Sequence, residues 1–271
     1  MDISELGFDI ISLGHGSGGL MTRELLDSII FKIFSNPYLD QKHDGSLIKV
    51  EGQLAVSTDS FVVSPIFFKG GNIGELAVNG TINDVAMCGA MPKFVSLAFI
   101  VEEGLTVSDF VKIVQSIKNT ADKCGVQIIT GDTKVVERGN GDKIFINTTG
   151  FGPVHPKANI AAAQIKTGDK IIINGLIAQH GMAIMSEREG LEFESSIISD
   201  TTNLNFLIWD LLDRFGDKIH LLRDPTRGGL ASVLSEIATD ITKGISLIEK
   251  EIPIEKQVAA ACEILGLDPL Y

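Results

Sequence analysis

Hydrophobic positions in the first 150 residues alternate between short continuous runs, which are typical of strands, and runs with helical spacing. The continuous runs predict strands at residues 8–13, 47–50, 53–57, 94–101, 126–129 and 144–148. Apolar residues three and four positions apart predict helices over residues 25–33, 72–88 and 108–124. Thr106 is the expected N-cap of the third helix, and the Glu51-Gly52 break predicts a β-hairpin between the second and third runs.

The same alternation returns after a loop that contains Gly150, Gly152, Pro153 and Pro156, which we take as a domain boundary near residue 157. We therefore expect domains at 1–157 and 158–271. Strands are predicted in the second domain at 170–173, 219–222 and 245–248, and helices at 181–189, 203–215, 230–241 and 255–265. The fold class that fits this order is α+β, with two lobes that each contain a mixed sheet.

Composition and charge narrow the function. The chain has 23 basic and 35 acidic side chains and a formal charge of −12, which disfavours nucleic acid and anionic membranes as partners. No apolar run approaches the roughly 18 residues of a membrane span, and the first residues are acidic, so we expect a cytoplasmic protein. The three cysteines form no metal-binding or disulfide pattern and are interpreted as small buried apolar residues.

Four aspartates occupy predicted turns or element ends, and they are Asp44, Asp59, Asp84 and Asp132. Carboxylates without a cluster of histidines or cysteines favour Mg²⁺, which usually shares its coordination with substrate phosphates. The alternative is that each aspartate only caps a turn or a helix. Lys134 follows Asp132 by two residues, so the two side chains share a face if the strand continues past Asp132.

Two glycine-rich segments precede predicted helices: Gly16-Ser17-Gly18-Gly19, and Gly228-Gly229 with Arg223 and Arg227 before it. Backbone N–H groups at a helix start can hold a phosphate, although neither segment is a Walker A motif and a plain turn is the alternative. Asn79 and Asn83 lie on the otherwise apolar helix 72–88, where they either face solvent or line a site. The residues alone thus indicate a two-lobed protein that binds a phosphorylated ligand through Mg²⁺.

Several segments together resemble the HypE-type nickel–iron hydrogenase maturation proteins, which belong to the superfamily of aminoimidazole ribonucleotide synthetase, selenophosphate synthetase and thiamine-monophosphate kinase. The segments are 14–19, 57–63, 72–77, 83–86, 131–136, 147–150, 223–230 and 267–271. The two that point to the hydrogenase branch are Gly131-Asp132-Thr133-Lys134-Val135-Val136 and Asp224-Pro225-Thr226-Arg227-Gly228-Gly229.

The resemblance implies an ATP-dependent dehydration of a carboxamide on the protein's own C-terminal cysteine, which yields a thiocyanate and supplies cyanide to the hydrogenase iron. It makes Asp44, Asp59, Asp84 and Asp132 ligands of Mg²⁺ and ATP, and it makes Lys134 and, as a candidate base, Glu137 catalytic. The residues implied to contact the nucleotide are Gly16, Ser17, Gly18, Gly19, Asn83, Thr226, Arg227 and Gly228.

The resemblance also implies partners. It predicts a homodimer that pairs the sheets of its N-terminal domains, with ATP in clefts at that interface and residues 16–19 as a flap. It further predicts a carbamoyltransferase maturation protein of the HypF type and an iron-assembly complex of the HypC–HypD type as partners.

Three departures from the family pattern matter. At His43-Asp44-Gly45 the chain lacks the second carboxylate that family members often carry beside the aspartate. At Ala178-Gln179-His180-Gly181 it lacks the aspartate of a turn found in the family. Family members continue past the position of Tyr271 to a cysteine tail, so we expect this sequence to be a fragment that cannot complete the reaction, and we interpret Cys262 as a core residue. The alternatives are another ATP-dependent member of the superfamily that acts on a small molecule, and a non-catalytic scaffold.

Overall fold

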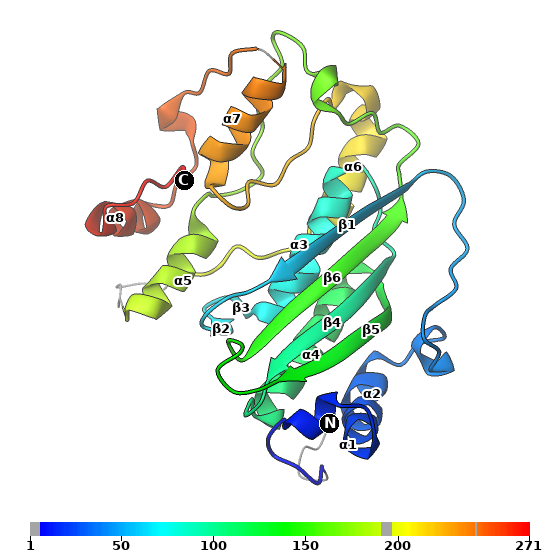
Figure 1. The fold of residues 1–271 in the computed structure, drawn as a ribbon. Helices are drawn as coiled ribbons and strands as arrows, with labels where there is room; N and C mark the ends of the chain where they lie inside the picture. The colour runs from blue at the N-terminus through cyan, green and yellow to red at the C-terminus, as the bar shows by residue number, and fades with distance from the viewer. Residues whose placement is uncertain (1–5, 191–196, 242) are drawn as a thin grey trace.

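The computed structural model describes residues 6–190, 197–241 and 243–271. Its centre is a four-stranded mixed sheet in the order β1-β6-β4-β5, formed by β1 (Leu54–Phe61), β6 (Ile144–Pro153), β4 (Phe94–Glu102) and β5 (Gln127–Val136). β6 is antiparallel to both of its neighbours, and β4 and β5 are parallel. The helices α3 (Ile73–Met87) and α4 (Val107–Cys124) cover one face, and the opposite face is open (Figure 1).

The two covering helices begin and end where the sequence predicts. The Thr106 hydroxyl accepts a hydrogen bond from the Asp109 N–H at 3.1 Å, and α4 ends at Gly125, whose φ of 69° is left-handed. The side chain of Asn72 caps α3 by accepting from the N–H groups of Gly74 and Glu75. The buried stripes of both helices pack on the sheet in one hydrophobic core, in which Phe110, Ile113 and Ile117 of α4 are fully buried.

Five strand predictions in the N-terminal part need correction. Residues 8–13 form only a single bridge between Ile10 and Thr106, and residues 47–50 form no strand, so the predicted hairpin is absent. Leu47 is 95% exposed and pairs with no other strand. β1, β5 and β6 are longer than predicted, which places Asp59 and Asp132 inside strands and not beyond their ends. Gly150, Gly152 and Pro153 accordingly belong to β6 and not to the predicted boundary loop, because they pair with β1.

The helix predicted over residues 25–33 is a longer, segmented one. It comprises α1 (Leu20–Leu25), a π-helical turn (Leu26–Ile30) and α2 (Phe31–Phe34). The remaining short elements of the N-terminal part are the two-residue strands β2 (Phe67–Phe68) and β3 (Gly71–Asn72), together with 3₁₀ turns at Leu13–Gly16 and Leu39–Gln41.

After the predicted boundary near residue 157, the helices match the predictions and the strands do not. The helices are α5 (Gln179–Glu189), α6 (Asn205–Phe215), α7 (Gly229–Ile241) and α8 (Lys256–Leu265). The 3₁₀ turns are Ala162–Gln164, Gly216–Lys218 and Glu249–Glu251. Residues 170–173, 219–222 and 245–248 join no ladder in the described part of the chain, and Ile172 is 89% exposed. Their apolar runs lack a strand partner there, so the sheet predicted for the second lobe is not formed.

The two parts of the chain meet along α3. Leu212 and Ile208 of α6 pack against Ala86 and Met87 at the end of α3 in a small hydrophobic cluster. The Asn83 side chain bonds the loop before α6, since its carbonyl accepts from the Leu204 N–H at 2.8 Å and its amide donates to the Thr202 carbonyl at 2.9 Å. Asn79 likewise donates to Thr201 at 3.3 Å. Both asparagines therefore bind the C-terminal part.

Candidate functional site

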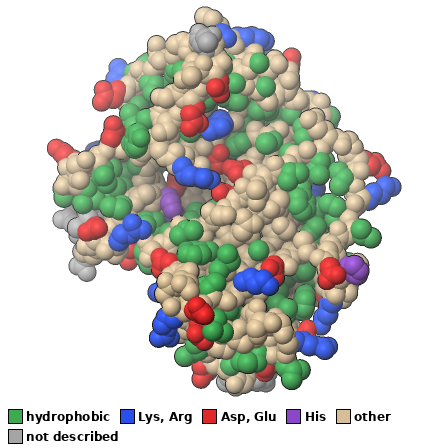
Figure 2. Space-filling view, viewed as in Figure 1, with side chains coloured by type: hydrophobic (Ala, Val, Ile, Leu, Met, Phe, Trp, Pro, Cys, Tyr) green, Lys and Arg blue, Asp and Glu red, His purple; other side chains and the backbone are tan. Residues whose placement is uncertain are grey.

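A cavity of about 970 Å³ lies where the sheet, the end of α3 and the C-terminal part meet. Its walls come from β1, from residues 158–160, from the loop at 221–227 and from Val233 and Glu236 in the middle of α7. Acidic and basic side chains gather around the hollow between the sheet and the C-terminal helices (Figure 2). Thr226 and Arg227, two of the residues implied to contact nucleotide, line this cavity together with Asp84.

Two carboxylates from different parts of the chain face each other in this cavity. Asp84 on α3 accepts a hydrogen bond from the Ser57 hydroxyl of β1 at 2.8 Å. Burial raises the pKa of Asp84, and the negative charge of Asp59 raises it further. Burial also raises the pKa of Asp224, and the charge of Asp84 adds to this shift. A divalent cation bound between these oxygens would relieve that repulsion, so the residues fit a magnesium site.

Asp224 is a site residue that the sequence patterns did not predict. It lies in the loop Arg223-Asp224-Pro225-Thr226-Arg227-Gly228-Gly229, where the arginines and glycines predict a phosphate contact. An acidic residue between two arginines was the available signal, because it could serve a metal that bridges to the same phosphate.

Asp59 lies next to this acidic pair and is bound by Arg227. The guanidinium Nη2 of Arg227 donates to Asp59 Oδ1 at 2.9 Å, although the two residues are 168 positions apart. Asp59 Oδ1 also accepts from the Ser60 N–H at 3.0 Å. The structure thus brings together Asp59, Asp84 and Arg227, which the sequence singled out, and adds Asp224.

The other candidate residues lie along or near β5, at the opposite edge of the sheet. Asp132 and Lys134 are both exposed on β5, and because the strand continues through Val136 they share one face, as predicted. Asp44 is exposed in the loop after α2, and nearby Ser46 hydrogen bonds to the Ile129 carbonyl of β5. Glu137 follows β5 directly and accepts from the Asn140 side chain at 3.2 Å.

The glycine-rich segment 16–19 lies against the same strand. A Cβ on Gly16 would lie 2.3 Å from the Val135 backbone nitrogen, so only glycine allows this contact. Gly18 and Gly19 have φ values of 80° and 144°, and a Cβ at either position would have no neighbour within 4 Å, so the tip of the segment is free of packing contacts. The Ser17 hydroxyl donates to the Gly14 carbonyl, and the Gly18 N–H donates to Thr22.

One chain therefore holds two separate sets of candidate residues. Asp59 pairs with Thr148 of β6, and Thr148 in turn pairs with Leu97 of β4; Thr148 and Leu97 are both buried under the helices. Asp132 instead pairs with Ala98 of β4 on the open face. β1 and β5 are also the two edge strands, three strand spacings or about 14 Å apart. Within the described ranges, no three aspartate, glutamate, histidine or cysteine side chains lie close enough to hold a metal ion.

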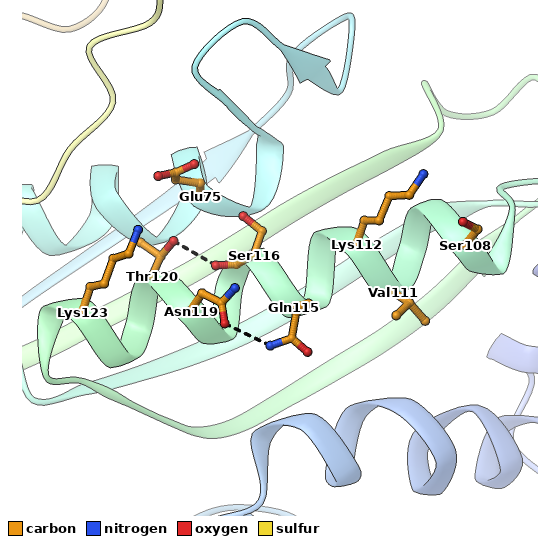
Figure 3. A pocket seen from close by; sticks show the side chains of 9 residues that line it. All are labelled: Glu75, Ser108, Val111, Lys112, Gln115, Ser116, Asn119, Thr120 and Lys123. Carbon is orange, nitrogen blue, oxygen red and sulfur yellow. Dashed lines mark hydrogen bonds between the residues drawn. The ribbon is translucent and has the colours of Figure 1, made fainter. Parts of the chain in front are cut away.

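A second, smaller hollow of about 470 Å³ runs along the outer face of α4 (Figure 3). Polar side chains line it, and Glu75 of α3 closes one side. Its polar side chains bond along the helix itself, as where Gln115 donates to Asn119 at 3.0 Å and Thr120 donates to the Ser116 carbonyl at 2.8 Å. None of the candidate residues lies in this hollow.

Comparison with known proteins defines the class of protein first. Residues 42–154 match the N-terminal domain of the AIR synthase related proteins, and residues 166–271 match their C-terminal domain. The fold also resembles thiamine monophosphate kinase from Aquifex aeolicus, at a TM-score of 0.60 and 17% identity over 93% of this chain and 84% of that one. The α+β class predicted from the sequence is confirmed.

Closer relatives define the family. The chain is 47% identical over 262 residues to the carbamoyl dehydratase HypE of Bradyrhizobium diazoefficiens, which covers 96% of this chain and 76% of that protein. HypE of Escherichia coli is 42% identical over 96% of this chain and 79% of its own length. A crystal structure of HypE in complex with ATP superposes with a TM-score of 0.93 at 45% identity, covering 96% of this chain and 77% of that one.

The chain therefore belongs to the HypE family of hydrogenase maturation proteins, as the sequence motifs predicted. It spans about three-quarters of the length of these relatives. Within the described ranges, no helix is both long and apolar enough to cross a membrane.

Proposed function

We propose that this chain is the ATP-binding part of a carbamoyl dehydratase that makes the cyanide precursor for a nickel–iron hydrogenase. The observation that carries the proposal is the likeness, over 96% of the chain, to a HypE structure in complex with ATP. The proposed substrate is the S-carboxamide of a C-terminal cysteine, R–S–C(=O)–NH₂, and the product is the thiocyanate R–S–C≡N.

The proposed chemistry turns the amide oxygen into a leaving group. The γ-phosphoryl group of ATP is transferred to the amide oxygen, which forms a C–O–P link and releases ADP. The C–O bond then breaks as the C≡N bond forms, and inorganic phosphate leaves with the former amide oxygen. The two amide protons pass to a base and to solvent.

The residues of the cavity would then bind the metal and the phosphates. Asp84 and Asp224 would supply oxygen ligands of the kind that Mg²⁺ prefers, with Asp59 beside them. Thr226 and Arg227 line the same cavity for the nucleotide, and Gly228 follows them in the chain. When bound, Mg²⁺ would neutralise charge on the transferred phosphoryl group. Asn83, which is predicted to contact the nucleotide, also binds residues 202–204 through its amide and so positions the C-terminal part.

A homodimer would unite the two separated residue sets. The open face of the sheet exposes apolar side chains, among them Val56 at 56% and Ile100 at 44%, as expected of a face that a second copy covers. If two open faces stack around a twofold axis parallel to the strands, the β1 edge of one copy lies beside the β5 edge of the other. Asp59 and Asp84 of one chain then approach Lys134, Asp132 and the 16–19 segment of its partner.

This arrangement gives Lys134 and Glu137 their proposed roles. Lys134 would contact the phosphate or the carboxamide from the partner side, Glu137 would be the candidate base, and residues 16–19 would cover the triphosphate. Sedimentation velocity tests the dimer, with Ile100→Asp expected to give monomers and Ile264→Asp on exposed α8 expected to leave the dimer intact. A wild-type monomer at micromolar concentration would contradict it.

The further proposed partners are a HypF-type carbamoyltransferase and a HypC–HypD-type assembly complex. A crystal structure of a HypE–HypF complex contains a chain that is 47% identical to this one, with a TM-score of 0.79 over 91% of this chain and 80% of that chain, which supports the first partner. The second rests on the family resemblance.

The central test is calorimetry of ATP binding with magnesium and with excess EDTA. We expect binding only with the divalent cation, because the carboxylates near the triphosphate repel it otherwise. Equal affinity in both buffers would overturn the magnesium assignment, and no binding in either would overturn the proposed ATP site.

A further inference from the structure

Arg227 has an unusual backbone conformation for a residue other than glycine. Its backbone φ is 47°, and it is followed by Gly228 and Gly229 with φ values of 85° and 64°, so three consecutive residues adopt left-handed conformations. Only glycine adopts this region freely, and Arg227 does so within a tight turn at the start of α7. The turn directs the guanidinium to β1, where it reaches Asp59.

The two partners of this ion pair differ in freedom. The Arg227 side chain is 83% exposed, whereas the Asp59 side chain is 20% exposed, lies inside β1 and is also bound by the Ser60 N–H. The carboxylate is therefore fixed by the sheet, and the guanidinium can leave. Because ion pairs with an exposed partner contribute little to stability, this departure costs little.

The pair lies close to the carboxylates that line the cavity. The charge of Asp59 raises the pKa of the Asp84 carboxyl, and the charge of Arg227 lowers it. Asp224 is a further carboxylate beside Asp84. A metal ion that binds Asp59 would compete with the guanidinium for Oδ1. Once a metal is bound, the charge of Arg227 is available for an anion.

We propose that Arg227 is a placeholder for the metal cation: it binds Asp59 in the ligand-free protein and is released to the triphosphate when the metal and nucleotide enter. This inference rests on the proposed ATP and magnesium site, and it adds an ordered exchange of partners at one residue. It also gives the left-handed turn a function, since the turn holds the guanidinium where it can contact either Asp59 or the triphosphate.

The chain offers a matched control on the same loop. Arg223 carries the same charge and lines the same cavity, and its Nη2 donates to Glu236 Oε2 of α7 at 3.3 Å. Removing Arg223 takes away one positive charge without freeing a proposed metal ligand. A difference between Arg227→Gln and Arg223→Gln thus separates competition for Asp59 from a general change of charge.

The experiment measures Mn²⁺ binding by electron paramagnetic resonance without nucleotide, in the full chain and in both variants. We expect Arg227→Gln to raise the Mn²⁺ affinity by about threefold to fivefold, the scale of a broken exposed ion pair, and Arg223→Gln to change it by less than about twofold. Calorimetry with magnesium and ATP is expected to show weaker nucleotide binding in Arg227→Gln. Adding Asp59→Asn to Arg227→Gln is expected to abolish the gain in Mn²⁺ affinity.

Other outcomes overturn the inference. An unchanged or lower Mn²⁺ affinity in Arg227→Gln, or an equal gain in Arg223→Gln, would show that the guanidinium does not compete with the metal. Failure of the proposed function has a different signature, because then the wild-type chain itself would bind no ATP in the presence of magnesium.

Discussion

The two parts of this chain differ in how completely they bury their apolar residues. In the N-terminal part, one large core links the paired strands to α3 and α4, and large side chains such as Phe110 and Ile117 are fully buried. In the C-terminal part, α5 and α8 share a small cluster around Val258 and Ala261, and apolar runs such as residues 170–173 are exposed. An apolar run forms a strand only where a neighbouring strand offers hydrogen bonds.

The largest expected effect comes from deleting a core aromatic ring. Phe110 of α4 is fully buried and packs edge-on against Phe99 of β4. We expect Phe110→Ala to lower the free energy of unfolding by about 3–5 kcal/mol in chemical denaturation, because it leaves a cavity. Ile172→Ala in the exposed run of the C-terminal part is the control, with an expected change within about 0.5 kcal/mol. Equal losses would contradict the contrast between the two parts.

Hydrogen exchange should report the same contrast along the backbone. The amides of β4 are paired on both sides, so they exchange only through large-scale opening, whereas those of residues 170–173 lack ladder partners in the structure. We expect the β4 amides to exchange at least about a hundredfold more slowly, as measured by mass spectrometry of peptides. Comparable protection of residues 170–173 would indicate that they pair in solution.

The proposed metal ligands form two sets, one beside β1 and one on β5, and a substitution in each set tests whether both contribute to one site. We expect Asp84→Asn and Asp132→Asn each to weaken binding of magnesium and ATP by about tenfold, which corresponds to about 1.4 kcal/mol. Asp122→Asn, an exposed position of α4 that is paired with Lys118, is the control and should bind normally. Circular dichroism should be unchanged in all three, and a loss of helical signal at Asp84→Asn would favour a structural role.

The smallest expected effect is a gain of stability at the junction of the two parts. Burial and the charge of Asp84 raise the pKa of Asp224 in the folded protein, so ionisation of this group opposes folding. The protonated carboxyl of Asp224 therefore contributes to the stability of the folded protein. This contribution is complete below the unfolded pKa of 3.8 and is lost as the pH rises through the folded pKa.

Asp224→Asn cannot ionise, so its melting temperature without metal should exceed that of the wild type at pH 7, and the difference should disappear below pH 3.8. Asp240→Asn, an exposed substitution on α7, serves as the control. A lower melting temperature for Asp224→Asn at pH 7 would show that its carboxylate stabilises the ligand-free protein.

Local rules predicted much of this molecule. Helical spacing together with Thr106 and Gly125 located α4 to within a residue, and the helices of the C-terminal part were found in the same way. The side chains of Asp132 and Lys134 share a face because a strand alternates with a period of two, which the sequence already contains. The family motifs were also local, and they led to the correct family.

Tertiary structure decided which residues meet. Residues 47–50 have a strand-like composition but no partner, so hydrogen bonding and not hydrophobicity determined their conformation. The contact of Arg227 with Asp59 joins positions 168 apart, and the separation of Asp59 from Asp132 depends on strand order and register, which no local pattern encodes. The sequence by itself determined the helices, the faces of the strands and the family. The folded chain alone placed the chemical groups, because distances between remote residues arise only when the sheet is assembled.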